Sequence, residues 1–120
     1  MDQSIQKSKE LQERMLNFAA SIVGLSEQLK HKSVADQMIR SASSIGANYS
    51  EALNASSKTD FRNKIYIAKK EAAETEYWLQ LVAKISDRDT AELQGECHAI
   101  LMILQKIVNT INDQRSRKDP

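Results

Sequence analysis

The sequence contains few of the residues that interrupt helices or cross-link chains. Its 120 residues include three glycines, one proline, which is the last residue, and a single cysteine, Cys97. This composition leaves few sites for the tight turns of a sheet, and one cysteine cannot form an internal disulfide. No segment approaches the roughly 18 consecutive apolar residues of a membrane-spanning helix. The sequence therefore predicts an all-α chain, and a start unlike a signal peptide predicts a cytoplasmic location.

The sequence also lacks an excess of either acidic or basic residues. Seventeen basic and 16 acidic residues give a net charge of +1, so the whole chain has no general attraction to nucleic acid. The exception is the segment 58–70, which has one acidic residue, Asp60, and five basic ones: Lys58, Arg62, Lys64, Lys69 and Lys70. Such a run on a helix is most often a solvated face, and the alternative is a local patch that binds nucleic acid.

The chemistry of common enzymes and metal sites is absent from the sequence. No Glu-x-x-His pair of the ferritin-like kind exists, because Gln28 and Gly95 stand three residues before the two histidines. Cys97 and His98 are adjacent and therefore diverge on a helix, which favours a buried, inert thiol. There is no glycine-rich phosphate loop. We expect no enzyme activity, cofactor, metal or small-molecule substrate.

What the sequence does contain is apolar residues that recur at alternating spacings of four and three. This pattern is typical of helices that pack along a seam. The seams are Leu11, Met15, Phe18, Ile22, Leu25 and Leu29; then Met38, Ala42, Ile45, Tyr49 and Ala52; then Phe61, Ile65, Ala68, Ala72, Thr75 and Leu79; and finally Leu93, Cys97, Ile100, Leu104, Ile107 and Ile111.

Short polar segments separate the four seams. The first helix is expected to end near the basic residues 30–32, and Ser33, followed by Asp36, to cap the second. Ser57, followed by Asp60, is expected to cap the third, and residues 86–89 form the last turn. Short connections make consecutive helices antiparallel neighbours, so residues 1–120 are expected to form one up-down-up-down four-helix bundle, with a frayed tail at 115–120.

A second apolar stripe runs along the third helix, on the side opposite Ala72. It contains Ile67, Trp78, Leu81 and Ile85, and the first helix has a weaker equivalent in Leu16, Ala20 and Val23. A bundle that left these side chains in water would expose a contiguous apolar patch. We therefore expect self-association into a homo-oligomer; the alternative is that the helices wrap more fully around one another.

The segment 40–51 is rich in small and polar residues that disfavour a helix interior. A helix here must therefore be held by close tertiary packing. The segment contains Arg40 and a Ser-Ile-x-x-Asn-x-x-Glu pattern formed by Ser44, Ile45, Asn48 and Glu51. With Ala68, Glu74 and Leu79, this pattern resembles the signature of the four-helix bundle protein family, also called 23S rRNA intervening-sequence proteins. The resemblance covers roughly residues 8–112.

The resemblance implies an antiparallel four-helix bundle that assembles as a homopentamer, encoded in some relatives within insertions of bacterial 23S rRNA genes. A related branch, the accessory variability proteins of diversity-generating retroelements, binds a reverse transcriptase and nucleic acid. Two hypotheses follow: a non-enzymatic oligomeric scaffold or interaction protein, and a weakly binding nucleic-acid accessory factor. The signature residues are interpreted as setting helix register and subunit contacts, with ligand or nucleic-acid binding as the alternative. Glu74, within the second stripe, needs a basic or hydrogen-bonding partner.

Overall fold

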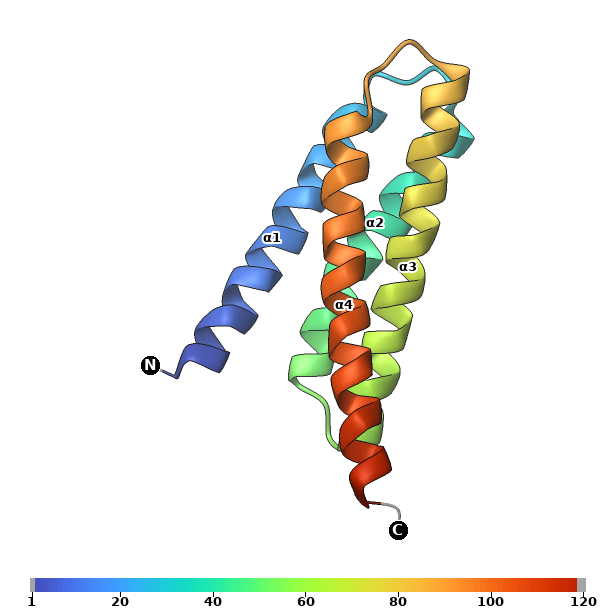
Figure 1. Ribbon diagram of the computed structural model, residues 1–120. Helices are drawn as coiled ribbons and strands as arrows, with labels where there is room; N and C mark the ends of the chain where they lie inside the picture. Colours follow the sequence, from blue (N-terminus) through green and yellow to red (C-terminus); the bar gives the residue numbers. More distant parts are fainter. Residues whose placement is uncertain (1, 119–120) are drawn as a thin grey trace.

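Four helices form the protein in the computed structural model, which describes residues 2–118, with side chains through Gln114 (Figure 1). They are α1 (Gln3–Ser26), α2 (Lys32–Leu53), α3 (Lys58–Ile85) and α4 (Ala91–Lys118), and the described residues contain no strand. The predicted all-α class is confirmed. The helical backbone extends through Lys118, beyond the point where we expected a frayed tail; residues 119 and 120 lie outside the described part.

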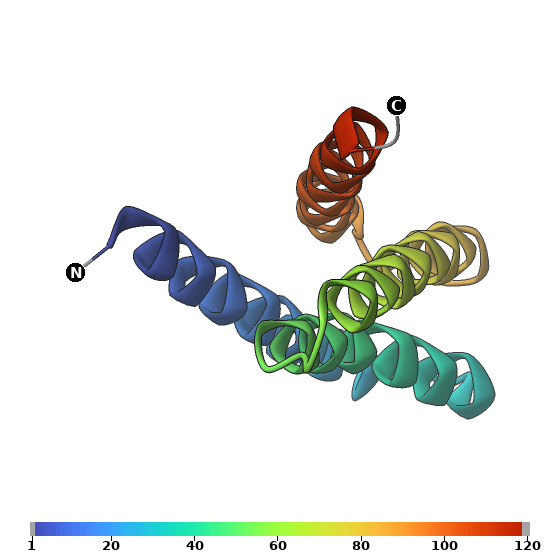
Figure 2. The same ribbon diagram turned by 90° about the horizontal axis from the view of Figure 1, so that it is seen from below.

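Successive helices run in opposite directions, and α2 and α3 share the most extensive contact (Figure 1). The α3–α4 and α1–α2 pairs are next, whereas α1 contacts α4 least. Figures 1 and 2 show why: α1 approaches α4 near the upper end and diverges from it towards the N-terminus. None of the helices, within the described residues, has the length and apolarity needed to cross a lipid bilayer.

The core follows the predicted seams closely along α1, α2 and α3. Most seam residues of these helices are buried, and Leu11 and Phe61 are half-buried. In α4, Val108 is buried whereas Ile107 is only partly so, which corrects the predicted seam. Ile107 lies about 20° from Glu96 around α4, on the side that faces the diverging α1, so it has less to pack against.

The cap of α3 was predicted correctly, and that of α2 was not. The Ser57 side chain accepts a hydrogen bond from the Asp60 amide at 3.0 Å, and the Asp60 carboxylate accepts from the Ser56 amide at 3.3 Å. By contrast, α2 begins at Lys32 after His31, whose side chain makes no capping bond, and Ser33 lies inside the first turn.

The first helix also ends earlier than expected, at Ser26 rather than near residues 30–32. The Gln28 and Leu29 amides bond to carbonyls three residues back, which tightens the chain into a turn. Leu29 remains buried in the core even though it lies beyond the helix. Its place in the apolar repeat therefore predicted its burial correctly but led to a predicted helix that was too long.

Close packing holds the small-residue segment of α2 in its helix. A Cβ atom added at Gly46 would lie 3.3 Å from the Cβ of Met15 in α1, so glycine permits the approach of the two helices. On the other side of α2, the hydroxyl oxygens of Ser41 and Thr75 are hydrogen-bonded at 2.8 Å in the core. The expected tertiary support for this segment is therefore present on both flanks.

Candidate interaction surfaces

A polar cluster joins α2 to α3 beside the second apolar stripe. The guanidinium of Arg40 in α2 donates to Oε2 of Glu74 and, at 3.2 Å, to Glu71. Its Nε donates to Gln37 at 3.1 Å. The indole Nε1 of Trp78 donates to Oε2 of Glu74 at 2.9 Å. The carboxylate predicted to need partners therefore has two of them.

These contacts favour the charged form of Glu74. The hydrogen bond from Trp78, and then the hydrogen bond and positive charge of Arg40, hold the pKa of Glu74 below its ordinary value, although partial burial opposes the shift. The hydrogen bond to Glu74 in turn raises the pKa of Arg40. Glu71, which completes the cluster, was missed by sequence reasoning because nothing local distinguishes it from the other glutamates of α3.

The remaining signature residues divide between the core and the α2 backbone. Ile45, Ala68 and Leu79 are fully buried. The side-chain amide of Asn48 donates to the carbonyl oxygen and the hydroxyl of Ser44, at 2.8 and 2.9 Å, within α2. These five residues lie where they fix the packing and conformation of α2 and α3.

Large apolar side chains are exposed on both stripes. On α3, Ile67 and Ile85 are 39% and 37% exposed, while Trp78 and Leu81 are half-buried. Tyr77, next to Trp78, packs edge-on against it with ring centroids 5.3 Å apart. The α3 stripe is thus only partly covered by the packing of the helices.

The α1 stripe is more exposed still. Leu16 is 64% exposed, Val23 is 38% exposed, and Ala20 lies at the surface. Leu16 borders a hollow of about 580 Å³ between α1 and α2, whose α2 wall is made of small residues that include Gly46 and Ala47.

The predicted basic patch does not form one face. Lys58, Arg62 and Lys69 lie within about 40° of one another around α3. Lys64 lies about 160° from Arg62 and approaches Glu51 of α2 at 3.6 Å. Lys64 therefore supports the α2–α3 contact, and Glu51 of the signature takes part in the same pair.

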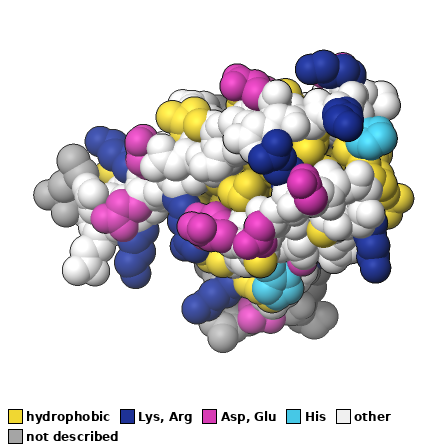
Figure 3. All heavy atoms as spheres, turned by 90° about the horizontal axis from the view of Figure 1, so that it is seen from above, with side chains coloured by type: hydrophobic (Ala, Val, Ile, Leu, Met, Phe, Trp, Pro, Cys, Tyr) yellow, Lys and Arg dark blue, Asp and Glu magenta, His cyan; other side chains and the backbone are white. Residues whose placement is uncertain are grey.

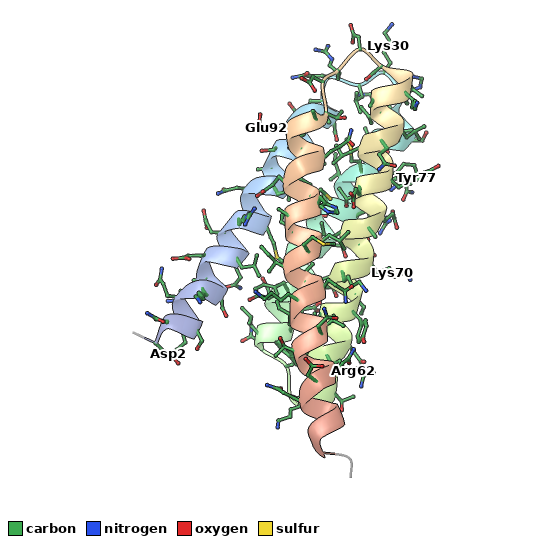
Figure 4. The ribbon with its side chains drawn as sticks, viewed as in Figure 1. Asp2, Lys30, Arg62, Lys70, Tyr77 and Glu92 are labelled. Atoms are coloured by element: carbon green, nitrogen blue, oxygen red, sulfur yellow. The ribbon has the colours of Figure 1, made fainter. Side chains whose placement is uncertain are left out.

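Arg62 is positioned by an aromatic side chain. Its guanidinium lies over the ring of Tyr66, 5.5 Å from the centroid. Figure 4 shows Tyr77, Lys70 and Arg62 in descending order along α3. Lys58 and Arg62 are therefore near the lower end of the bundle, where α3 begins, while Lys70 is higher on the outer surface.

An ion pair between α1 and α4 was also not predicted from the sequence. Arg14 donates from Nε and Nη2 to the two carboxylate oxygens of Glu96, at 2.8 and 2.7 Å, and this pairing lowers the pKa of Glu96. Glu10, Glu13 and Glu92 line the hollow of about 590 Å³ around it. Seen from above, the upper end of the molecule carries interspersed acidic and basic side chains, so neither sign dominates there (Figure 3).

Cys97 and the adjacent His98 have different surroundings. Cys97 is buried, with Sγ 3.3 Å from the carbonyl oxygen of Ala72, and burial raises the pKa of its thiol to about 12. His98 is exposed, and its Nδ1 lies 3.1 Å from Glu76 of α3. Among the described residues, no three His, Cys, Asp or Glu side chains gather as metal ligands.

Comparison with known proteins places the chain in a family. The model of the 23S rRNA-intervening sequence protein family matches residues 4–106. A comparison with curated proteins gave no match. A crystal structure of a protein of unknown function, from the S23 ribosomal protein family of Bacteroides thetaiotaomicron VPI-5482, superposes with a TM-score of 0.77 at 35% identity, over 86% of this chain and 98% of that one. The resemblance seen in the signature residues is therefore confirmed, and the chain belongs to the 23S rRNA-intervening sequence protein family.

Proposed function

We propose that this chain is a non-enzymatic scaffold whose antiparallel four-helix bundle is the subunit of a homo-oligomer. The supporting observation is the pair of exposed apolar stripes, one on α3 around Trp78 and one on α1 around Leu16. At about 25 cal/mol per Å² of apolar surface, covering several such side chains supplies several kcal/mol towards association. Ordering and rotational costs take part of that gain.

The two stripes are different surfaces, which bears on the symmetry of the assembly. A contact between the α3 stripe of one copy and the α1 stripe of the next is heterologous, and heterologous contacts close into rings when the rotation fits. The family resemblance indicates five copies in such a ring. The Arg40–Glu74 pair beside the α3 stripe would then set the register between subunits.

The test is the mass of the assembly in solution. Sedimentation equilibrium of the wild-type chain at micromolar concentration is expected to give a closed oligomer, with five copies as the predicted number. Leu16→Lys and Ile85→Lys, which place a charge on each stripe, are expected to dissociate it. Trp78→Lys is a less specific change because it also removes the hydrogen bond to Glu74.

Met102→Lys is the matched control, because Met102 is 46% exposed on α4 and belongs to neither stripe. It is expected to leave the mass unchanged. A monomeric wild-type chain would refute the scaffold proposal, and a closed oligomer of another size would refute only the pentamer. Assembly that survives both stripe variants would place the interface elsewhere.

Nucleic-acid binding is the second candidate function, favoured by the cationic face of α3. Lys58, Arg62 and Lys69 share this face with Tyr66, and the structure shows no carboxylate within ion-pair distance of these three cations among the described residues. Binding of this kind would depend on neutralising phosphates, so it should be weak and insensitive to sequence, and it should disappear as salt rises. A ring would repeat the face once per subunit and strengthen the interaction.

Titration of labelled RNA and duplex DNA at low and near-physiological salt tests this second candidate. The double variant Arg62→Glu/Lys69→Glu should abolish binding, whereas Lys64→Glu, on the other side of the helix, is the control that should retain most of it. No binding at low salt leaves the scaffold as the only proposed function. Binding that resists salt and both charge reversals excludes this face.

A further inference from the structure

The largest hollow described on the molecule lies at its lower end and has an unusual lining. It has a volume of about 690 Å³ and is formed where α2 ends, α3 begins and α4 approaches its C-terminus. Among the side chains that the structure describes, its charged lining residues are two cations, Lys58 and Arg62. The described lining itself contains no carboxylate, although the Asp60 carboxylate lies beside it, 3.3 Å from the Ser56 amide.

Arg62 has no acidic partner among the side chains that the structure describes. Its guanidinium lies over Tyr66, and its Nε is buried with no hydrogen-bond partner among the described atoms. No described carboxylate comes within ion-pair distance of Arg62 or Lys58. The buried Nε is itself closed to the hollow, so an anion there would be held by the terminal nitrogens of Arg62 and by Lys58, which have no described acidic partner.

The rest of the lining is apolar or neutral. Leu53 of α2, Phe61 of α3 and Ile111 of α4 contribute apolar surface, and the exposed residues Ser56 and Thr59 contribute hydroxyl groups. A hollow with an apolar wall and a few convergent polar groups is the usual form of a small-ligand site. An inorganic ion alone would leave the apolar wall exposed to water.

The start of α3 does not itself supply the attraction for an anion. The side chains of Ser57 and Asp60 already cap this end, and the Asp60 carboxylate accepts from the Ser56 amide. Asp60 lies about 160° around α3 from Arg62, so its charge is directed away from the guanidinium. The cations and the apolar wall therefore define the site.

We propose that this hollow binds a small organic anion, with its phosphate or carboxylate on Arg62 and Lys58 and its apolar body against Leu53, Phe61 and Ile111. The described lining of the hollow shares no residue with either apolar stripe. A polynucleotide held by Lys58 and Arg62, as in the second candidate function, would compete with this ligand for the same two cations.

Isothermal titration calorimetry of the full chain tests the proposal with matched probes. 1-Naphthyl phosphate and 1-naphthoate share an apolar body and carry the two candidate anionic groups, and 1-naphthol is the neutral equivalent. At least one of the two anions is expected to bind saturably and more tightly than 1-naphthol or inorganic phosphate. The stronger of the two identifies the anionic group that the site prefers.

Two pairs of variants locate the binding. Arg62→Gln is expected to weaken it on the order of tenfold or more, while Arg88→Gln, at the opposite end of the molecule, is expected to leave it unchanged. Thr59→Glu introduces a carboxylate three residues from Arg62, within its reach, and should block the site. Thr59→Gln, which has the same length without the charge, should not.

Thr59→Glu also keeps the test decisive if Arg62→Gln fails to fold, because Thr59 is exposed and an acidic residue suits the first turn of a helix. Circular dichroism melting curves establish that each variant is folded. Equal binding of 1-naphthol, or anion binding that is unaffected by Thr59→Glu, would overturn the proposal. So would the binding of a short single-stranded RNA at this site when neither naphthyl anion binds.

Discussion

Trp78 donates a hydrogen bond from its indole to the Glu74 carboxylate, one helical turn earlier in α3, at 2.9 Å. The same oxygen accepts from Arg40 of α2, so one carboxylate connects the half-buried tryptophan to the neighbouring helix. The hydrogen bonds from Trp78 and Arg40 lower the pKa of Glu74 in the folded chain. Its protonation state therefore affects stability.

The first prediction concerns the pH dependence of this carboxylate. A group with a lowered folded-state pKa stabilises the fold above its unfolded-state pKa and loses that effect as pH falls through the folded-state pKa. Glu74→Gln should therefore reduce the free energy of unfolding near neutral pH, and the difference from wild type should shrink below the ordinary carboxylate pKa of 4.5. Urea unfolding at several pH values and fixed protein concentration measures this. A difference that stays constant down to pH about 3 would contradict the assignment.

The second prediction compares two serines near helix starts. Ser57 caps α3 through its hydrogen bond with the Asp60 amide, so Ser57→Ala should cost about 1 kcal/mol of stability. Ser33 lies in the first turn of α2 and makes no cap, so Ser33→Ala should change stability by less than about 0.5 kcal/mol. Thermal melting of both variants distinguishes them. Equal losses would mean that Ser33 also supports its helix.

The third prediction concerns the glycines. Gly46→Leu should destabilise the fold by about 1 to 3 kcal/mol, because even a Cβ atom there meets Met15 at 3.3 Å. A Cβ atom at Gly95 meets no atom within 4 Å, so Gly95→Ala should stabilise α4 by about 0.5 to 1 kcal/mol. Denaturant unfolding gives both values. Tolerance of leucine at residue 46 would show that α1 and α2 do not approach as closely in solution.

The fourth prediction concerns the only cysteine. Burial and a thiol pKa of about 12 keep Cys97 protonated and shielded near neutral pH. Its reaction with a thiol reagent should therefore be slow in the native chain and fast in denaturant. The coloured product of an aromatic disulfide reagent reports both rates. Rapid labelling without denaturant would show that α4 opens readily around Cys97.

The burial pattern was largely predictable because it depends on local spacing. Phe18, Ala42 and Ala72 each lie in a four-and-three repeat, and all are buried, since a helix turns the same face inward along its length. The repeat contains no information about where a helix stops. Leu29 was therefore correctly expected in the core, but the prediction that α1 extends past it was wrong. The cap of α2 was misplaced for the same reason.

The polar contacts between helices were less predictable. Glu74 was expected to need a partner, but the choice of Arg40 and the participation of Glu71 depend on how α2 and α3 are rotated against each other. Lys64 was grouped with a basic patch by its position in the sequence. Its approach to Glu51 follows from a packing angle that no local pattern contains.

The divergence of α1 from α4 also affects local opening of the chain. The early turns of α1, residues 3–10, are almost entirely exposed, and the Arg14–Glu96 pair lies on the stretch of α1 that still borders α4. Backbone amides in these turns should exchange with solvent through local opening well before those of α2 and α3. A helix that opens at small cost is also the one that neighbouring molecules can capture without unfolding the remaining three.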